Sequence, residues 1–411
     1  MYIMALNCGS SSLKYQIFDV NSKTSIIGGS VEKIGLIDSF LTQKYPDGAK
    51  QRKEVAMKNH DDALTEVINM LRDASIDLTQ IGGVGHRVVL GGEKFKSSIE
   101  INDEVIKAID ELSAIAPLHN PANLTGIVAA KQLLPLAKQV AIFDTAFFST
   151  LPEHAYRYAV PSAWYRELGV RKYGFHGTSH LYVSKRAAKL LNNPEPNLIT
   201  MHIGSGASAA AIRKGLAVDT SLGMTPLSGL TMGSRPGDLD PGVVIYVQQR
   251  LGLSADTMQK ILNKESGHIG LTECFQDRRD LEENRETNPI CQLALDIEAN
   301  NAKKYIGAYM ATLGHVDAIV FTAGVGENDG YLREKITSGL EELGIKIDQD
   351  KNAKGLARLG AGETEISTPD SKVKVFMIPT NEELVIVEDT IAIMNGTYNP
   401  NHMEMNYSFA K

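Results

Sequence analysis

Residues 198–208 read Leu-Ile-Thr-Met-His-Ile-Gly-Ser-Gly-Ala-Ser. The first six are mostly apolar, and they lead directly into Gly204 and Gly206. A buried strand that ends in a glycine turn lets backbone N–H groups come close to an anion, because no Cβ atom stands in the way. The segment therefore predicts a phosphate-binding turn, and the rest of the sequence has to indicate its architecture.

Three architectures compete for this turn. A Walker A loop needs Gly-x-x-x-x-Gly-Lys-Ser/Thr, which this segment lacks. Gly204, Gly206 and Ala209 match a dinucleotide fingerprint, but that fingerprint requires a helix next. Instead the apolar run stops at residues 213–215, Arg-Lys-Gly, and a short apolar stretch follows. This pattern favours a β-hairpin, with an ordinary glycine turn that binds nothing as the alternative.

The same arrangement occurs at the start of the chain. A buried strand over residues 3–6 is followed by Asn-Cys-Gly-Ser-Ser-Ser, an alternating strand over residues 13–17, a turn and a third strand over residues 25–31. The two copies of this meander lie about two hundred residues apart. An internal repeat of this kind predicts two similar domains that face a shared cleft.

Composition limits the classes of function. A chain of 411 residues is long enough for two domains, and its formal net charge of −7 comes from interspersed acids. Basic residues are scattered without aromatic partners, so no nucleic-acid surface is expected. No apolar run reaches membrane-spanning length, and residues 1–6 are too short for a signal sequence. Three cysteines without metal-type spacing favour a reducing cytoplasm.

Most other elements follow from hydrophobic periodicity and helix-start signals. Helices are predicted over residues 61–74, 103–113, 120–134 and 289–313, with a terminal helix that starts at residues 379–383 and continues to residue 394. Strands are predicted over residues 81–89, 140–143, 318–322 and 373–378. Asn120 is predicted to cap the helix that continues to residue 134, and Thr178 or Ser179 to cap a helix that continues to residue 191. Residues 147–171 are expected to be irregular, residues 219–240 a long functional loop, residues 323–326 a turn, and the segment after Gly396 loosely attached.

Several predicted strands end in polar or small residues, namely Asn7, Arg87, Asp144, Ser205 and Gly324. Ligands of α/β sheets bind at that edge. Phosphoryl transfer needs cationic groups around the moving phosphoryl and a metal that neutralises charge. The cationic or polar candidates are Arg87, His119, His176 and Arg235, and the oxygen ligands or proton handlers are Asn7, Asp144 and Glu382.

Each of these residues also has an ordinary structural interpretation. Asp144 would suit a loop-capping role, and His176 a hydrogen-bonded core position. Glu382 lies in the first turn of a predicted helix, where a carboxylate is favourable without any metal. Arg235 would suit pairing with Asp238 or Asp240. No single residue therefore identifies the chemistry.

Taken together, the motifs resemble those of acetate kinases. The resemblance covers nearly the whole chain in order, and it rests on residues 7–14 (Asn-Cys-Gly-Ser-Ser-Ser-Leu-Lys), 85–92 (Gly-His-Arg-Val-Val-Leu-Gly-Gly), 116–120 (Ala-Pro-Leu-His-Asn), 143–146 (Phe-Asp-Thr-Ala), 171–180 (Arg-Lys-Tyr-Gly-Phe-His-Gly-Thr-Ser-His), 220–226 (Thr-Ser-Leu-Gly-Met-Thr-Pro), 321–328 (Phe-Thr-Ala-Gly-Val-Gly-Glu-Asn) and 378–384 (Ile-Pro-Thr-Asn-Glu-Glu-Leu).

The resemblance implies an α/β fold of two duplicated actin-like, ribonuclease H-like domains, with mixed central sheets flanking a nucleotide cleft. One domain would comprise residues 1–147 and 384–411, and the other residues 148–383. The implied activity is reversible, direct in-line transfer of the ATP γ-phosphoryl to acetate, which gives acetyl phosphate and ADP. It also implies Mg²⁺, with Mn²⁺ as the alternative ion, together with a cytoplasmic homodimer that binds neither nucleic acid nor a membrane.

The motifs carry roles over to particular residues. Arg87 would hold the substrate carboxylate, Asp144 would be the catalytic carboxylate, and His176 and Arg235 would stabilise the transition state, with His119 nearby. Asn7 and Glu382 would position the metal ion. The nucleotide would be contacted by Lys14, His202, Ile203, Gly204, Ser205, Gly206, Asp277, Arg278, Arg279, Gly324, Val325, Gly326, Glu327 and Asn328. Because a carboxylate substrate is ionised at pH 7, we expect Asp144 to position groups rather than to remove a proton.

The acyl pocket would comprise Val89, Leu118, Phe175 and Pro226, and valine at position 89 favours acetate over propionate. Some positions depart from the family pattern. Ser205 stands where asparagine is usual, Leu90 and Phe148 stand where histidine is common, and Ser-Arg-Pro replaces Thr-Arg-Cys or Thr-Arg-Ser at residues 234–236. The alternatives are a propionate kinase, a variant with another phosphoryl donor such as pyrophosphate, and a nucleotide-binding regulator without transfer activity.

Overall fold

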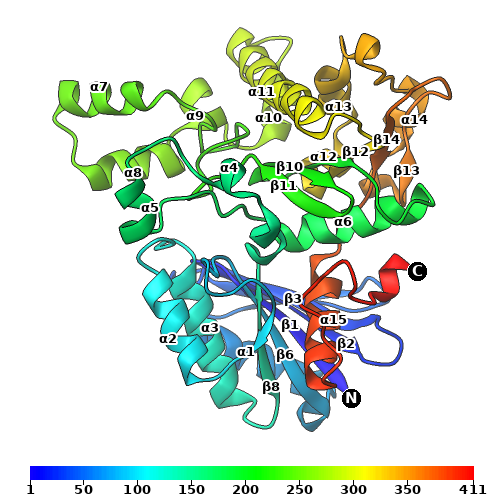
Figure 1. The fold of residues 1–411 in the computed structure, drawn as a ribbon. Helices are drawn as coiled ribbons and strands as arrows, with labels where there is room; N and C mark the ends of the chain where they lie inside the picture. Colours follow the sequence, from blue (N-terminus) through cyan, green and yellow to red (C-terminus); the bar gives the residue numbers. More distant parts are fainter. The chain divides into compact units, whose positions relative to one another are not determined.

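The computed structural model describes all 411 residues, and the chain forms two compact units (Figure 1). The first unit comprises Met1–Ser149 and Asn381–Ser408. The second comprises Thr150–Thr380 and Phe409–Lys411. No helix of the chain combines the length and the hydropathy that crossing a membrane requires.

An eight-stranded sheet forms the centre of the first unit. Its strands are β1 (Tyr2–Cys8), β2 (Ser12–Asp19), β3 (Ser25–Glu32), β4 (Phe40–Lys44), β5 (Lys50–Glu54), β6 (Ile81–Val88), β7 (Ile99–Glu100) and β8 (Lys138–Phe143). They are ordered β5-β4-β3-β2-β1-β6-β8-β7. β1 to β5 form an antiparallel meander, whereas β1, β6 and β8 run parallel, so the ends of these three strands meet at one edge.

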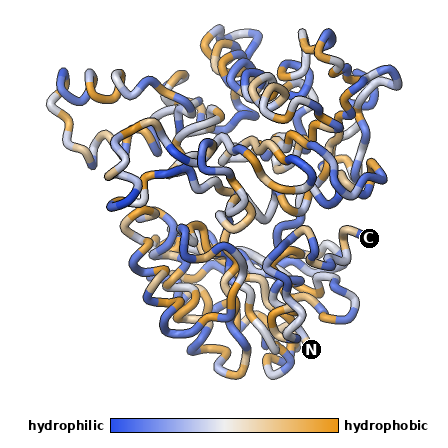
Figure 2. Tube along the Cα trace, viewed as in Figure 1, coloured by the Kyte–Doolittle hydropathy of each residue, from blue (hydrophilic) through white to orange (hydrophobic).

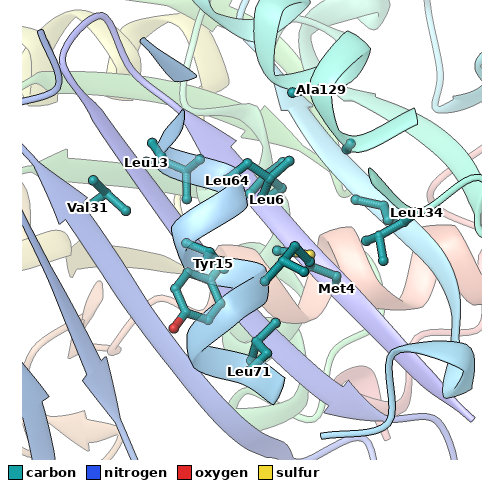
Figure 3. Packing of buried hydrophobic residues seen from close by; sticks show 14 of the residues in the cluster. Met4, Leu6, Leu13, Tyr15, Val31, Leu64, Leu71, Ala129 and Leu134 are labelled. Atoms are coloured by element: carbon teal, nitrogen blue, oxygen red, sulfur yellow. The ribbon is translucent and has the colours of Figure 1, made fainter. Parts of the chain in front are cut away.

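Helices cover both faces of this sheet (Figure 1). They are α1 (His60–Asp73), α2 (Asp103–Leu112), α3 (Asn120–Leu133) and α15 (Glu382–Met394). Alternation along β1 explains the two faces, because successive side chains of a strand point to opposite sides. Met4 and Leu6 pack with α1 and α3, as Figure 3 shows, whereas Ile3 and Ala5 pack with α15. Hydrophobic and hydrophilic stretches accordingly alternate along these helices (Figure 2).

A six-stranded sheet forms the centre of the second unit, in the order β11-β10-β9-β12-β14-β13. Its strands are β9 (Leu198–Ile203), β10 (Ala207–Arg213), β11 (Leu216–Thr220), β12 (Ala318–Thr322), β13 (Thr364–Glu365) and β14 (Lys374–Met377). β9 and β12 are buried along their whole length, as expected for parallel strands covered on both faces. α6 packs on β9 and β12, and α11 packs on β9 and β10.

The helices of the second unit vary widely in length. They are α4 (Glu153–Tyr156), α5 (Ser162–Leu168), α6 (Gly177–Leu190), α7 (Pro241–Leu251), α8 (Ala255–Lys264), α9 (Gly267–Thr272), α10 (Arg278–Asn284), α11 (Pro289–Leu313), α12 (Ala323–Asn328), α13 (Gly330–Thr337) and α14 (Gln349–Lys354). α4 and α5 lie within residues 147–171, which the sequence predicted to be irregular. The predicted loop over residues 219–240 contains neither helix nor strand from residue 221 onward, whereas residues 219 and 220 end β11.

The predicted duplication is confirmed by the order of the strands. β3-β2-β1-β6-β8 in the first unit corresponds to β11-β10-β9-β12-β14 in the second, with the same antiparallel and parallel pairings. The hairpin prediction is also confirmed. Ile203 pairs with Ala207, and Gly204 N–H donates to the carbonyl of Gly206 at 2.9 Å.

The local predictions at residues 176–179 and 323–326 were wrong. His176, rather than Thr178 or Ser179, precedes the first residue of α6, and its backbone is left-handed with φ 59°. The Ser179 hydroxyl instead bonds to His202 Nδ1 at 2.8 Å. Residues 323–326, which were predicted to be a turn, begin α12 directly after β12. The carboxylate of Glu327 accepts a hydrogen bond from Ala323 N–H at 2.8 Å and so stabilises that helix start.

The segment after Gly396 is attached more firmly than the sequence suggested. Tyr407 is buried, and its hydroxyl donates to Asp389 of α15 at 2.8 Å. Ser98 donates to the other oxygen of Asp389 at 2.6 Å. Ser408 bonds to Glu388 through both its backbone N–H and its hydroxyl. Two adjacent buried carboxylates therefore hold the C-terminal segment on the first unit.

We expect Asp389→Asn to gain stability relative to the unmodified chain as the pH rises. Burial raises the pKa of Asp389 to about 6, although the Ser98 and Tyr407 hydroxyls oppose the rise. Because the folded state then holds a proton that the unfolded state has released above about pH 4, stability falls between about pH 4 and pH 6. The difference in free energy of unfolding between variant and unmodified chain should rise by about 2 kcal/mol from about pH 4.5 to 7.5. Urea unfolding measures it.

The exposed Asp73, which ends α1, supplies the matched control, and Asp73→Asn should show no such trend. A constant difference between Asp389→Asn and the unmodified chain across this range would show that Asp389 titrates normally in the folded protein.

Candidate active site

The ends of three parallel strands bring polar side chains together in the first unit. Asn7 lies near the end of β1, Arg87 near the end of β6, and Asp144 directly after β8. β6 pairs with both neighbours, so these three residues lie at one edge of the sheet. Lys14 of β2 is paired with Asn7 across the β1–β2 ladder. The sheet thus assembles four of the predicted residues without any contribution from a long loop.

Arg87 and Asp144 form a bidentate ion pair. Arg87 Nε donates to Asp144 Oδ1 at 2.9 Å, and Nη2 donates to Oδ2 at 2.6 Å. The Asp144 side chain is 0% exposed and that of Arg87 is 20% exposed. Burial opposes the charge on Arg87, but attraction by Asp144, Glu382 and Glu383 outweighs it, so the pKa of Arg87 is raised. The guanidinium is therefore a fixed cation with a defined orientation.

The two edges of the Arg87 guanidinium have different surroundings. The edge formed by Nε and Nη2 faces Asp144, whereas Nη1 contacts only Asn7 Oδ1, at the long distance of 3.5 Å. A guanidinium has five N–H groups, and two short bonds to Asp144 leave three of them. Arg87 therefore retains donors for a second carboxylate.

Two buried asparagines, to which the sequence analysis assigned no role in the site, fix the loop that follows β6. Asn123 Oδ1 accepts from Val89 N–H at 3.0 Å, and Asn123 Nδ2 donates to the carbonyl of Cys8 at 2.7 Å. Asn120 bonds to both backbone groups of Leu90, at 3.1 Å each. Asn120 was predicted to cap α3, but it is the first helical residue and its side chain serves this loop. The position of Val89 is thereby set by α3.

The other predicted residues of this unit lie at the starts of two helices, α3 and α15. Leu118 is 43% exposed, and His119 directly precedes α3. Glu382 and Glu383 occupy the first turn of α15, which begins with an Asn381 cap. Burial raises the pKa of Glu383 despite the nearby cations Lys14 and Arg87. Acidic groups thus face the strand ends from the helix start.

In the second unit, His176 and Arg235 converge on the predicted phosphate hairpin. A Cβ atom added to Gly206 would lie 2.9 Å from Arg235 Nη2 and 3.2 Å from His176 Nε2. Arg235 Nη1 donates to the carbonyl of Pro226 at 2.8 Å, which fixes the guanidinium, and neither Asp238 nor Asp240 pairs with it. Burial lowers the pKa of Arg235 from its ordinary value, yet arginine remains charged at neutral pH. A cation and an imidazole therefore line the glycine turn.

A group of buried histidines and hydroxyls supports His176. Ser208 Oγ lies 2.8 Å from His176 Nδ1 and 2.8 Å from His180 Nε2. His180 Nδ1 lies 2.7 Å from Thr200 Oγ1. The rings of His176 and His202 are stacked, with centroids 4.1 Å apart. His176 directly precedes α6 and His180 lies in the first turn of that helix, and the sequence analysis assigned no role to His180 or Ser208.

A pocket of about 870 Å³ lies beside the hairpin in the second unit. Of the predicted nucleotide residues it is lined by Gly204, Ser205, Asp277, Arg278, Arg279, Gly324, Val325 and Asn328. Ser205 is exposed at the apex of the turn. The further lining residues of the pocket include His268, Gln276, Glu298 and Arg358, none of which belongs to a motif in the sequence analysis. His202, Ile203, Gly206, Gly326 and Glu327 are not among its lining residues.

Charged groups form part of the pocket wall. Arg278 is buried and donates to Glu298 at 2.7 Å and to Glu282 at 2.9 Å, and it also pairs with Asp329. Burial opposes the charge on Glu298, but Arg278 and His268 outweigh it and lower its pKa. His268 Nδ1 is buried without a hydrogen-bond partner, and Nε2 lies 3.6 Å from Glu298 Oε2. A ligand with several hydrogen-bonding groups would suit this wall, since unpaired buried polar atoms are costly.

The model of the acetokinase family matches residues 2–388 of this chain. Curated acetate kinases from Trichlorobacter lovleyi and Geobacter sulfurreducens are each 51% identical to it over 418 aligned residues, covering 100% of this chain and 99% of the relative. Among solved structures, acetate kinase from Porphyromonas gingivalis is similar with a TM-score of 0.89 and 46% identity, covering 96% of this chain and 99% of that one. A propionate kinase from Francisella tularensis is similar with a TM-score of 0.89 and 37% identity, covering 94% and 98%.

Proposed function

Because this chain belongs to the acetokinase family, we propose that it transfers the γ-phosphoryl group of ATP to acetate, reversibly, giving acetyl phosphate and ADP. The observation that carries this proposal is the convergence of Arg235 and His176 on Gly206 in the phosphate hairpin. A phosphoryl group in transfer carries negative charge on its equatorial oxygens, and fixed donors around it lower the barrier.

The acceptor would bind to Arg87. Its Nε–Nη2 edge is occupied by Asp144, so the substrate carboxylate would use the donors that remain on Nη1 and Nη2. Acetate is ionised at neutral pH and needs no general base to become a nucleophile. Asp144 would then act by holding the guanidinium in place, and one acetate oxygen would attack the γ-phosphorus while ADP leaves on the opposite side.

Asn7 and Glu382 would hold a Mg²⁺ ion. No group of three or more His, Cys, Asp or Glu side chains forms a metal cage in this chain. Mg²⁺ commonly keeps several waters and binds through one or two protein oxygens plus substrate phosphates. An amide and a carboxylate fit that donor set, and Asn7 Oδ1 makes only one long contact, to Arg87. The ion would neutralise charge on the donor phosphates when bound.

The pocket beside the hairpin supports a nucleotide as donor rather than pyrophosphate. The pocket has a volume of about 870 Å³ and polar groups along its wall, which is more space than the second phosphate group of pyrophosphate would need. Gly204 and Ser205 of the hairpin also line this pocket, so a base and ribose in it would lead to the phosphate turn. Serine at position 205 supplies a hydroxyl donor with shorter reach than asparagine.

We expect acetate to be preferred over longer acids. Val89 is buried, and Asn123 fixes its backbone, so the side chain has little freedom to make room for an extra methylene. One methylene is worth about 1–3 kcal/mol in such a pocket. Propionate should therefore react with a kcat/KM at least about 10-fold below that of acetate.

Trapping of acyl phosphate with hydroxylamine tests the proposed function. Acetate, propionate and butyrate are each crossed with ATP, GTP and pyrophosphate. The proposal predicts the highest rate for acetate with ATP. A higher rate with propionate or with pyrophosphate would favour the corresponding alternative kinase. Nucleotide binding without any hydroxamate would support a non-catalytic regulator and would overturn the proposal.

We also propose that the protein is a homodimer that associates through α7. No residue of α7 is buried, and Val243, Ile245, Tyr246 and Leu251 are 45%, 56%, 67% and 65% exposed. Exposed apolar side chains gathered on one helix are typical of an interface. Because ATP and ADP are its co-substrates, we place the enzyme in the cytoplasm.

The double substitution Ile245→Asp and Tyr246→Ser should convert the dimer to a monomer, because it introduces a charge into the apolar interface and removes an aromatic anchor. Light scattering after size exclusion gives the mass. Leu136→Asp, at an isolated position that is 85% exposed, is the matched control and should leave the dimer intact. A monomeric unmodified chain, or a dimer that survives the double substitution, would contradict this interface.

A further inference from the structure

Four side chains of the second unit form a continuous hydrogen-bonded chain that ends at the phosphate hairpin. Thr200 Oγ1 bonds to His180 Nδ1 at 2.7 Å, and His180 Nε2 bonds to Ser208 Oγ at 2.8 Å. Ser208 Oγ in turn bonds to His176 Nδ1 at 2.8 Å. Thr200, His180 and Ser208 are each 0% exposed, so water does not compete for these bonds. The Nε2 atom of His176 faces the Gly206 turn.

The direction of these bonds depends on the charge of His180. Burial, together with the nearby His202 ring, keeps the pKa of His180 well below its ordinary value. A neutral imidazole has one N–H donor and one acceptor nitrogen. Each of its nitrogens bonds to a hydroxyl, so only two directions are available for the whole chain of bonds.

Thr200 decides between the two directions. Its hydroxyl has His180 Nδ1 as its one partner. If His180 Nδ1 carried the proton, the Thr200 hydroxyl would accept that bond, and its own proton would be buried without an acceptor. Such a loss costs about 1–3 kcal/mol. Thr200 therefore donates to His180 Nδ1, His180 Nε2–H donates to Ser208, and Ser208 donates to His176 Nδ1.

We propose that Thr200, His180 and Ser208 are positioning residues that fix the tautomer of His176, so that its proton lies on Nε2 and points to the phosphate hairpin. The inference rests on the proposed function, because the proton on Nε2 would donate to the phosphoryl group in transfer. His176 then acts as a neutral donor beside the cationic Arg235. The rings of His176 and His202 are stacked with their centroids 4.1 Å apart, and this arrangement does not require a positive charge on His176.

Nitrogen NMR of the full-length protein labelled with ¹⁵N-histidine tests the tautomer directly. His176→Gln assigns the His176 signals by their disappearance. In the unmodified protein, Nδ1 of His176 should be unprotonated and Nε2 protonated. Thr200→Val removes the donor at the start of the chain and should allow the reversed tautomer. Its kcat should fall about 10-fold, while KM for acetate and for ATP changes less than about 2-fold.

Two further variants separate this role from general stability. Thr200→Ser keeps the hydroxyl and should recover both the tautomer and most of kcat. Thr337→Val removes a buried threonine hydroxyl of α13, which donates to the Arg333 carbonyl, and should leave the tautomer and kcat unchanged. A proton on His176 Nδ1 in the unmodified protein would overturn the proposal even if Thr200→Val failed to fold. So would an unchanged tautomer and kcat in Thr200→Val.

The tautomer measurement does not depend on turnover. Failure of the proposed function would appear as absence of hydroxamate with every donor and acceptor. Failure of the positioning role would appear as the wrong tautomer in a protein that still makes hydroxamate.

Discussion

Arg87→Met is expected to lower both stability and activity, and adding Asp144→Asn is expected to recover the stability alone. Removing Arg87 leaves the carboxylate of Asp144 fully buried without its bidentate partner. Breaking a buried pair in this way costs about 3–5 kcal/mol. The double variant has no buried charge at this position, so its free energy of unfolding should return to within about 1 kcal/mol of the unmodified chain.

The activity of both variants should stay low. Without the guanidinium, the substrate carboxylate has lost the donors that would hold it, and kcat/KM for acetate should fall by about 10³-fold or more. Urea unfolding and the hydroxamate assay measure the two effects separately. Recovery of activity in the double variant would show that Arg87 serves stability and that the substrate binds elsewhere.

Lys346→Met provides a control for charge removal. Lys346 pairs with Asp370 at 2.7 Å, but both side chains are exposed. An exposed pair contributes about 0–1 kcal/mol, so this variant should keep its stability and its activity. If Lys346→Met lost as much stability and activity as Arg87→Met, the buried Arg87–Asp144 pair would matter no more than an exposed pair.

Gly206→Ala is the second substitution with a large expected effect. A Cβ atom at this position would lie 2.9 Å from Arg235 Nη2 and 3.2 Å from His176 Nε2. Both groups would have to move away from the hairpin to make room. Because each fixed donor around a developing charge contributes a factor of about 10²–10³, kcat should fall at least about 100-fold. The stability should change little, since the displaced groups are partly exposed and the backbone of Gly206 is not in the left-handed region.

The matched control for this substitution is Gly307→Ala in α11. A Cβ atom there meets nothing within 4 Å, and alanine favours a helix interior more than glycine does. Its kcat should equal that of the unmodified chain. If Gly206→Ala also kept its kcat, Arg235 and His176 would not act at this turn.

The sequence allowed the fold to be predicted because its most informative signals are local. A buried strand followed by a glycine turn and two further strands occurs twice, and the parallel strands β6 and β8 place Arg87 and Asp144 beside Asn7. Asn7 and Arg87 lie near the ends of their strands and Asp144 directly follows one, so the strand assignment was sufficient to bring them to one sheet edge. Family motifs then supplied roles that no single residue could indicate.

The remaining features depend on contacts between residues far apart in the sequence. Asn123 reaches Cys8 across 115 positions, and Glu327 bonds to Thr380 across 53. Their side chains would be equally suited to solvent or to a cap, so the sequence carried no signal for either contact. The C-terminal segment was misjudged for the same reason, because its polar composition conceals the buried bond from Tyr407 to Asp389.

Phosphorus NMR of the products formed from ATP and [¹⁸O₂]acetate tests the central claim most directly. If an acetate oxygen attacks the γ-phosphorus, acetyl phosphate and ADP form together, and every acetyl phosphate carries one ¹⁸O bonded to phosphorus. That labelled product, formed in a one-to-one ratio with ADP, is the result we predict. AMP and pyrophosphate as products, or ADP without labelled acetyl phosphate, would contradict the assignment of this chain as a kinase that phosphorylates acetate directly.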